Sequence, residues 1–143
     1  MITSAFHYAF KVKDIESTRA FYADILGCAE GRSTESWIDF DFFGNQLSAH
    51  VSVELSEPDY CGLVDGVQVP IPHFGCILKQ DDFKRIQEKL LTAEVTFILK
   101  PQQRYAGQVG EQVNMFVLDY SGNAPEFKSF RNTNELFSEQ GDV

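Results

Sequence analysis

The segment that decides the fold is Asp119-Tyr120-Ser121-Gly122-Asn123-Ala124-Pro125-Glu126-Phe127-Lys128, a polar turn followed by a largely apolar strand that carries one carboxylate. The same pattern occurs earlier in the chain, where the turn Gly44-Asn45 precedes a strand that contains His50. Glu126 follows its turn glycine by four residues and His50 by six, so both fall on the same strand face if the turns match. We infer that the two segments are the last strands of two copies of one structural unit.

The two halves also open in the same way. Residues 5–12 and residues 71–78 each have the composition of a strand. A helix with an acidic N-cap follows each, starting at Asp14 in the first half and at Asp81 or Asp82 in the second. Further strands are expected over 36–43, 46–53, 95–99 (ending at Pro101), 111–118 and 124–130. The order predicts an α+β fold of two tandem βαβββ modules, which form a curved mixed sheet around a cleft.

A length of 143 residues suits a single domain with a substantial core. Within this domain we expect the first module over about 4–54 and the second over about 71–130. Residues 55–70 are rich in proline, glycine and acidic residues without sustained periodicity, which indicates a linker. The polar residues 131–143 are expected to form a tail.

Charge and targeting signals exclude several classes of function. The formal net charge is −9, with no cluster of lysine or arginine, so nucleic acid and anionic membranes are not expected partners. No apolar run is long enough for a transmembrane helix, and no signal peptide is recognisable. The three cysteines include no C-x-x-C pair, so we interpret them as reduced thiols of a cytoplasmic protein.

The chain contains only three histidines, and the two halves place them at related positions. His7 and His73 lie in the opening strands, whereas His50 and Glu126 lie in the closing strands. Imidazole and carboxylate groups together suit a divalent transition metal rather than calcium or magnesium. We therefore predict a metal site made by these four residues.

Three stretches resemble the vicinal oxygen chelate superfamily, which includes glyoxalase I, bleomycin-resistance proteins and extradiol dioxygenases. The first is Phe6-His7-Tyr8 with residues 14–22 and Leu26-Gly27, and the second is Pro72-His73-Phe74-Gly75. The third and most specific runs over residues 107–128, where the family carries an Asp-Pro-x-Gly-Asn turn before a metal-binding glutamate and this chain has Tyr120 in place of the proline. This last stretch looks most like small single-domain members of the extradiol dioxygenase type.

The resemblance implies that His7, His73 and Glu126 are the metal ligands, as in the 2-His-1-carboxylate site of extradiol dioxygenases. Fe(II) is then the favoured metal, with Ni, Co, Mn or Zn as alternatives. The position of a fourth ligand in glyoxalase-like members falls on His50, which is either a ligand or a general acid/base. The implied activity is an Fe(II) dioxygenase that acts on a small vicinal diol or catechol-like substrate.

Two other functions stay open from the sequence. One is a glyoxalase- or epimerase-like lyase or isomerase whose metal acts as a Lewis acid. The other is a ligand-binding protein of the bleomycin-resistance kind without enzymatic activity. Tyr105 is a candidate catalytic residue and Arg104 a candidate substrate-binding residue. The resemblance also implies a homodimer, with the metal site either inside one chain or shared by two.

Overall fold

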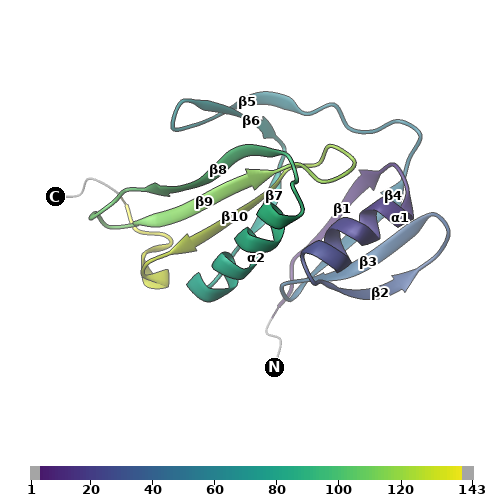
Figure 1. Cartoon of the computed structure of the whole chain (residues 1–143), viewed down its shortest axis with the longest axis horizontal. Helices are drawn as coiled ribbons and strands as arrows, with labels where there is room; N and C mark the ends of the chain where they lie inside the picture. The colour runs from purple at the N-terminus through teal and green to yellow at the C-terminus, as the bar shows by residue number, and fades with distance from the viewer. Residues whose placement is uncertain (1–3, 140–143) are drawn as a thin grey trace. The chain divides into compact units, whose positions relative to one another are not determined.

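The computed structural model describes residues 4–139, which divide into two compact units. The first unit comprises the chain up to residue 57 together with residues 119–123. The second comprises residues 58–118 and the chain from residue 124 onward. Each unit contains one four-stranded mixed sheet with a helix (Figure 1).

The sheet of the first unit has the strand order β1-β4-β3-β2. β1 pairs in parallel with β4, and the other two pairings are antiparallel. One face of the sheet carries buried side chains such as Phe40, Leu47 and Ala49, whereas the other face carries Gln46, Ser48 and His50. The strands are β1 (His7–Val12), β2 (Ala29–Ser33), β3 (Trp37–Phe42) and β4 (Asn45–Val51).

The first helix begins as the sequence predicts. Asp14 caps α1 (Ile15–Arg19) by accepting a hydrogen bond from the backbone N–H of Ser17. The chain continues as a π-helical segment, η1 (Ala20–Ile25), which buries Phe21 and Tyr22. Leucine and glycine follow at 26 and 27, and Gly27 adopts a φ of 77°, which ends the helix at the expected position.

The turn at residues 119–123 belongs to this first unit. Asn123 Nδ2 donates to the Lys11 carbonyl oxygen at 2.9 Å, and the Lys13 N–H donates to Ser121 Oγ at 2.9 Å. Below the turn, the buried Tyr22 hydroxyl donates to Asp119 Oδ2 at 2.8 Å. The polar turn noted in the sequence therefore joins β1 and the first helix by hydrogen bonds.

The sheet of the second unit repeats this topology in the order β7-β10-β9-β8, which confirms the tandem βαβββ organisation. β7 pairs in parallel with β10, and β10–β9 and β9–β8 are antiparallel. The predicted end of a strand at Pro101 is wrong, because β8 continues through it. β8 is an edge strand with a register irregularity between Leu99 and Gln102. The missing N–H of a proline at this place therefore costs few hydrogen bonds between strands. The strands are β7 (Phe74–Ile77), β8 (Phe97–Arg104), β9 (Gln112–Val117) and β10 (Pro125–Phe130).

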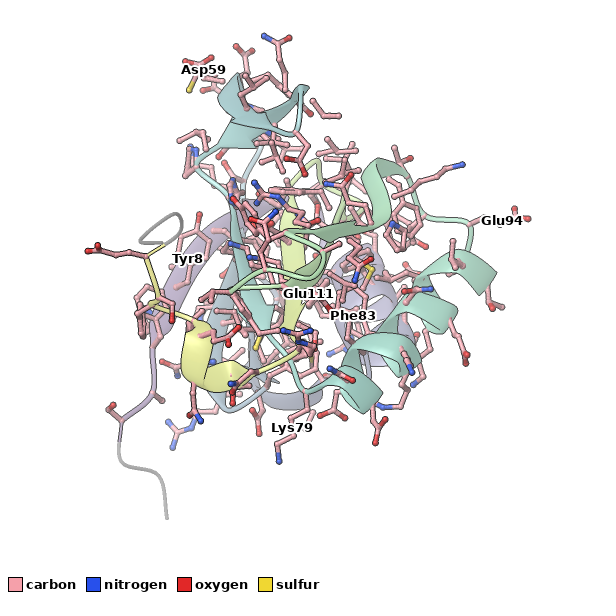
Figure 2. All side chains as sticks on the ribbon, turned by 90° about the vertical axis from the view of Figure 1, so that its left-hand side faces the viewer. Tyr8, Asp59, Lys79, Phe83, Glu94 and Glu111 are labelled. Atoms are coloured by element: carbon pink, nitrogen blue, oxygen red, sulfur yellow. The ribbon has the colours of Figure 1, made fainter. Side chains whose placement is uncertain are left out.

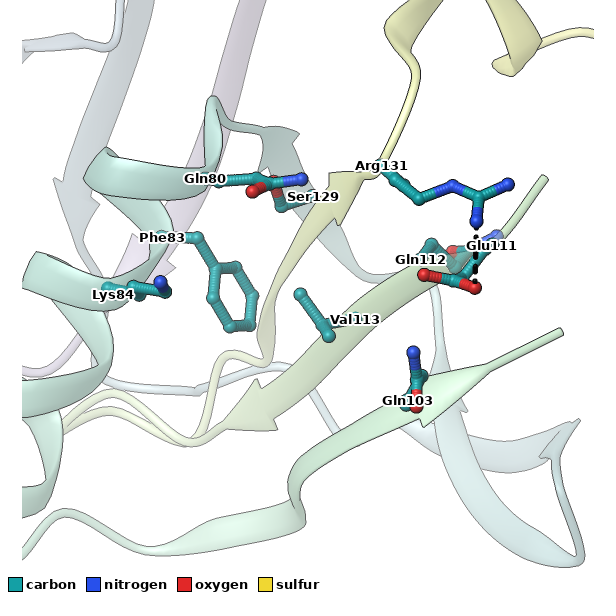
Figure 3. Close-up of a pocket in the computed structure, with 9 residues that line it drawn as sticks. All are labelled: Gln80, Phe83, Lys84, Gln103, Glu111, Gln112, Val113, Ser129 and Arg131. Atoms are coloured by element: carbon teal, nitrogen blue, oxygen red, sulfur yellow. Dashed lines mark hydrogen bonds and ion pairs between the residues drawn. The ribbon is translucent and has the colours of Figure 1, made fainter. Parts of the chain in front are cut away.

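Helix α2 (Gln80–Thr92) packs on this sheet through Phe83, Ile86 and Leu90. Its N-cap is Lys79 and not Asp81 or Asp82, which instead occupy the first turn, where carboxylates favour the helix dipole. Figure 2 shows Lys79 and Glu94 at the two ends of the helix. The first turn leaves a hollow over one end of the sheet (Figure 3).

Residues 55–70, expected to be an aperiodic linker, contain most of a β-hairpin. Its strands are β5 (Asp59–Val64) and β6 (Val67–Ile71), joined at Asp65-Gly66, where both residues have positive φ. An Asp-Gly turn between strands is a strong hairpin signal, which the linker interpretation missed. Val69 of the hairpin packs with Leu99 and Phe116, so the hairpin covers the face of the second sheet opposite α2.

Residues 131–139 of the expected polar tail include a short 3-10 helix, η2 (Thr133–Glu135), and Glu135 accepts a hydrogen bond from the Gly110 N–H. Residues 140–143 of that tail lie outside the described residues. Over residues 4–139, every helix is too short or too polar to cross a bilayer.

Candidate metal site

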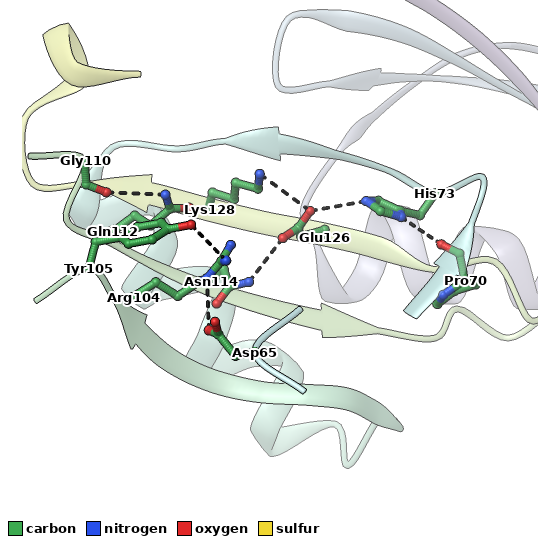
Figure 4. A network of polar contacts seen from close by, with 10 residues as sticks. All are labelled: Asp65, Pro70, His73, Arg104, Tyr105, Gly110, Gln112, Asn114, Glu126 and Lys128. Atoms are coloured by element: carbon green, nitrogen blue, oxygen red, sulfur yellow. Dashed lines mark hydrogen bonds and ion pairs between the residues drawn. The ribbon is translucent and has the colours of Figure 1, made fainter. Parts of the chain in front are cut away.

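The second unit brings together two of the predicted metal ligands, His73 and Glu126. His73 Nε2 lies 3.3 Å from Glu126 Oε1. Glu126 is in β10, directly opposite Gly75 of β7, and His73 immediately precedes β7. The parallel pairing of β7 with β10 therefore places both side chains near the N-terminal ends of these two neighbouring strands (Figure 4).

The His73 ring is held from two sides. Nδ1 lies 2.8 Å from the Pro70 carbonyl oxygen, which can only accept a hydrogen bond, so Nδ1 carries the proton. The ring also packs edge-on against Phe116, with centroids 4.7 Å apart. This arrangement directs Nε2 toward Glu126, the orientation that metal-binding histidines normally receive from a carbonyl behind them.

The electrostatics of the pair favour a proton on His73. The hydrogen bond to Glu126 raises the pKa of His73 above its ordinary value of 6.5, and the Pro70 carbonyl adds to this effect. Partial burial and the positive charge of Lys128 act in the opposite direction. The contact with Glu126 therefore extends the pH range over which His73 keeps its proton, and a metal that binds Nε2 would have to displace this proton.

Glu126 is buried, with 7% of its surface exposed, and its contacts are few and long. Asn114 Nδ2 donates to Oε2 at 3.2 Å, and Lys128 Nζ lies 3.9 Å from Oε1. Asn114 and Lys128 lie on neighbouring strands, paired in register, and on the same sheet face as Glu126. The carboxylate is thus oriented by an amide without being fully neutralised.

Gly75 allows the two strands to meet at this point. A Cβ atom at position 75 would collide with the carbonyl oxygen of Glu126. The Gly75 backbone is paired with Glu126 in the parallel ladder. A glycine here therefore sets the close approach of β7 to the ligand-bearing strand.

A cavity of about 290 Å³ opens beside the pair. Its lining includes His73, Glu126 and Lys128, together with residues 74–77 of β7. The two candidate ligands are therefore accessible to an ion or a small molecule.

The other two histidines lie on the first unit, where both are exposed. His7 is the first residue of β1 and pairs in register with Gln46 of β4. His50 pairs with Lys11 and Trp37, and its ring lies 6.5 Å from the Trp37 ring, centroid to centroid. Gln46 and His50 are four positions apart, or roughly 13 Å along a strand, so His7 and His50 lie at different points on one face of this sheet.

Ser48 corresponds to Glu126 when the turn glycines are matched. Ser48 follows Gly44 by four residues, as Glu126 follows Gly122, whereas His50 matches the position of Lys128. Ser48 donates its hydroxyl to Asp39 at 2.6 Å and is buried. The first unit thus has a small hydrogen-bonded serine where the second has its carboxylate.

Arg104 and Tyr105 contact each other at the end of β8. Arg104 Nη2 donates to the Tyr105 hydroxyl at 3.1 Å, and the guanidinium lies 4.9 Å from the centre of the tyrosine ring. Arg104 Nε also lies 3.0 Å from Asp65 Oδ2 in the turn of the β5–β6 hairpin, an ion pair without hydrogen-bond geometry at Nε. Arg104 pairs in the β8–β9 ladder with Gln112, two residues from Asn114, so these side chains border the Glu126 region (Figure 4).

The donor atoms in the second unit suit a transition metal. Two ligands of one metal ion at about 2.1 Å lie roughly 3 Å apart, which matches the separation of His73 Nε2 and Glu126 Oε1. Among residues 4–139, neither unit groups three His, Cys, Asp or Glu side chains closely enough to hold a metal. The second unit therefore offers two candidate ligands, and a metal site built on them would need at least one more.

Sequence reasoning missed Asn114, Lys128, Pro70 and Gly75. The position of Lys128 was available in principle, because residues two apart in a strand share a face. Asn114 is also visible as the one amide in the apolar run Val113–Val117. The contact of His73 with the Pro70 carbonyl depends on the path of the chain between β6 and β7 and has no local signal.

Comparisons with known proteins agree with this architecture. The model of the glyoxalase/bleomycin resistance protein/dioxygenase superfamily matches residues 4–127. Metallothiol transferase FosB of Lysinibacillus sphaericus (strain C3-41) is 26% identical over 129 residues, which cover 88% of this chain and 82% of that protein.

Two solved structures extend the comparison. A glyoxalase/bleomycin resistance protein/dioxygenase from Alicyclobacillus acidocaldarius superposes with a TM-score of 0.77 at 25% identity, covering 94% of this chain and 97% of that one. A mutant of the fosfomycin resistance protein FosX from Listeria monocytogenes, solved with Mn(II) and 1S,2S-dihydroxypropylphosphonic acid, gives a TM-score of 0.70 at 18% identity and covers 97% of this chain and 100% of that one. The chain belongs to the glyoxalase/bleomycin resistance protein/dioxygenase superfamily.

Proposed function

We propose that the protein is a metal-dependent enzyme in which His7, His73 and Glu126 bind one divalent transition metal. The observation that carries the proposal is the His73–Glu126 pair, in which a carbonyl fixes the ring and an amide orients the carboxylate. His7 enters from the correspondence of the two modules and from the family resemblance. We assign His50 an acid/base role and not a ligand role, because His50 lies well away from His7 on the sheet of the first unit.

The chemistry that we favour is Lewis-acid activation of a small, anionic, oxygen-rich substrate. A bound metal would polarise oxygen atoms of the substrate in the cavity beside His73 and Glu126. Lys128 lines the same cavity and provides a cation for a carboxylate or phosphonate group of the substrate. The relative FosB is named as a metallothiol transferase, which supports group transfer to such a substrate as one form of this chemistry.

The residues of the chain then have separate tasks. Pro70 and Asn114 hold the two ligands in orientation, and Phe116 keeps one side of the His73 ring dry. Lys128 positions the anionic end of the substrate, whereas His50 accepts or returns a proton. Arg104 and Tyr105 act as a further contact for the substrate, with Asp65 restraining the guanidinium.

A second candidate function is the extradiol dioxygenase activity that the sequence resemblance implies. It is favoured by the ligand set itself, because two histidines and one carboxylate leave coordination positions open for both a diol and dioxygen. It requires Fe(II), whereas Lewis-acid chemistry works with Mn, Co, Ni or Zn.

Metal binding is the first test. Metal-free protein is titrated with Mn(II), and the free ion is measured by electron paramagnetic resonance, for the wild type and for His73→Ala. Glu88→Gln, at an exposed position of α2, is the control for loss of a carboxylate. We expect one Mn(II) per chain and a loss of at least about 100-fold in affinity for His73→Ala only. Equal affinity in wild type and His73→Ala would refute the site.

Oxygen uptake separates the two candidate functions. Protein loaded with Fe(II) without oxygen is mixed with a panel of catechols in an oxygen electrode, and protein loaded with Mn(II) is assayed for thiol addition to epoxides bearing a phosphonate or carboxylate. Oxygen consumption that depends on His73 would select the dioxygenase. Thiol addition without oxygen, reduced in Lys128→Gln mainly through KM, would select the Lewis-acid enzyme.

We also propose that the protein is a cytoplasmic homodimer. Cys61 and Cys76 are free thiols, which agrees with a reducing compartment. Mixing His7→Ala with His73→Ala tests whether the ligands come from two chains. If they do, the mixed dimer regains one intact site and half of the metal content, whereas sites inside single chains give no recovery.

A further inference from the structure

A second hollow lies on the opposite face of the sheet from the metal site, beside the first turn of α2. We call it the α2 hollow, and its volume is about 170 Å³. Residues from α2, β9 and β10 line it, among them Phe83, Lys84, Gln112, Val113, Ser129 and Arg131. Figure 3 shows Phe83 pointing from α2 toward Val113, with Arg131 and Glu111 joined beyond Gln112. None of these residues takes part in the proposed chemistry of His73 and Glu126.

One buried polar atom in the α2 hollow lacks a partner among the described residues. Within residues 4–139, the Ser129 hydroxyl is buried and makes no hydrogen bond, and Ser129 is only 2% exposed. A buried polar group without a partner costs about 1–3 kcal/mol. Ser129 also stands in a strand face that is otherwise packed with apolar residues such as Met115 and Phe127. A ligand in the α2 hollow that forms a hydrogen bond with the Ser129 hydroxyl would explain why a polar side chain occurs on this apolar face.

The charges around the α2 hollow favour an anion. Lys84 and Arg131 are its two cations, and the partial positive charge of the N-terminus of the 13-residue helix α2 adds to them. Glu111 is the carboxylate in the lining, and it already accepts from Arg131 and from the Gly107 N–H. Asp81 and Asp82 lie in the same helical turn but outside the lining.

We propose that the α2 hollow binds a small hydroxycarboxylate. Its carboxylate would contact Lys84 and Arg131, its hydroxyl would bond to Ser129, and its carbon atoms would contact Phe83 and Val113. At about 30 Å³ for each water in the liquid, the hollow has room for roughly six non-hydrogen atoms. Lactate and glycerate have this size and both functional groups.

The test is a titration of the full-length protein followed by backbone amide chemical shifts. Lactate is expected to bind with a Kd of about 1 mM. Acetate, which lacks the hydroxyl, and propane-1,2-diol, which lacks the charge, are each expected to bind about tenfold more weakly. The shifts should be largest around the residues of the α2 hollow.

Two variants and one control make the site falsifiable. Lys84→Gln and Ser129→Ala should each raise the lactate Kd about tenfold, whereas Lys89→Gln, on the same helix but outside the lining, should leave it unchanged. If Ser129→Ala does not fold, the comparison of Lys84→Gln with Lys89→Gln decides, because both positions are exposed. Unchanged lactate affinity in either folded variant, or no saturable binding below about 50 mM, would overturn the proposal. Mn(II) affinity should be the same in all of these proteins, so the result is independent of the metal site.

Discussion

Two buried carboxylates, one in each unit, have opposite environments. Asp119 in the first unit accepts four hydrogen bonds of 2.8–3.0 Å from the Tyr22 hydroxyl, the N–H groups of Ser121 and Asn123, and Asn123 Nδ2. Among the described residues, Glu126 in the second unit has only the Asn114 amide at 3.2 Å, His73 at 3.3 Å and Lys128 at 3.9 Å. Burial raises the pKa of Asp119, while its hydrogen bonds lower it.

This difference separates a carboxylate with a structural role from one that is available to bind a ligand. Every donor around Asp119 comes from the protein, so the group holds the turn at 119–123 to the first helix. Glu126 faces a cavity with part of its bonding capacity unused, next to an imidazole that is also held in place. A buried acid that the protein leaves incompletely bonded is the one that can bind an ion.

Exchanging each carboxylate for its amide should give the largest and most divergent effects. Glu126→Gln removes a candidate ligand and should lower Mn(II) affinity at least about 100-fold, while leaving thermal stability without metal nearly unchanged at a pH above the folded pKa of His73. Asp119→Asn places an amide N–H₂ among donors and should cost about 2–3 kcal/mol of unfolding free energy, with unchanged Mn(II) affinity in the folded protein. Urea unfolding and Mn(II) titration of both variants check this, and parallel losses in both would contradict the distinction.

The close approach of β7 to β10 provides the next test. Gly75→Ala forces a Cβ against the Glu126 carbonyl and should cost about 2–3 kcal/mol, together with part of the metal affinity. Gly31→Ala on the edge strand β2 is the matched control, since a Cβ there meets the Asp39 Cβ at 3.3 Å and needs only a small shift. Equal stability of the two variants in urea unfolding would show that the β7–β10 spacing is adaptable.

The amide that orients Glu126 should have a smaller effect. Asn114→Ala removes the hydrogen bond to Oε2 and should weaken Mn(II) binding about tenfold. Gln102→Ala, the register partner of Asn114 on β8, removes a bond to Asp65 and should leave metal binding unchanged. Titration of the two variants side by side measures the difference, and an effect of similar size in Gln102→Ala would point to a general loss of packing.

The smallest effect concerns pH. Since the folded chain raises the pKa of His73, the metal-free ion pair stabilises the protein fully below pH 6.5, and this contribution is lost as the pH rises through the folded value. Metal binding has the opposite dependence and should weaken about tenfold per pH unit below the folded pKa. Melting curves of metal-free wild type and His73→Asn between pH 5 and 9 (roughly the range in which imidazole titrates) should converge as the pH rises. Curves that stay parallel would show that the pair carries no such linkage.

Part of this molecule could be predicted from local sequence, and the reason is visible in particular residues. Asp14 is followed three residues later by the N–H that it caps, and β4 alternates polar and apolar residues, so neighbouring positions contain the signal. The β5–β6 hairpin was equally local, since Asp65-Gly66 marks its turn. The N-cap of α2 was misplaced because Lys79 caps without a side-chain hydrogen bond.

The sequence by itself determined the two βαβββ modules and the superfamily, and it named His73 and Glu126 as candidate ligands, because periodicity and turn chemistry act over a few residues. Only the tertiary structure decided which polar groups meet. His73 and Glu126 are 53 residues apart in the chain, and their contact depends on the register of β7 with β10 and on the absence of a side chain at Gly75. Pairing between strands distant in sequence is a property of the whole sheet, so the long-range contacts of Glu126 and Asp119 could be identified only once the sheets were assembled.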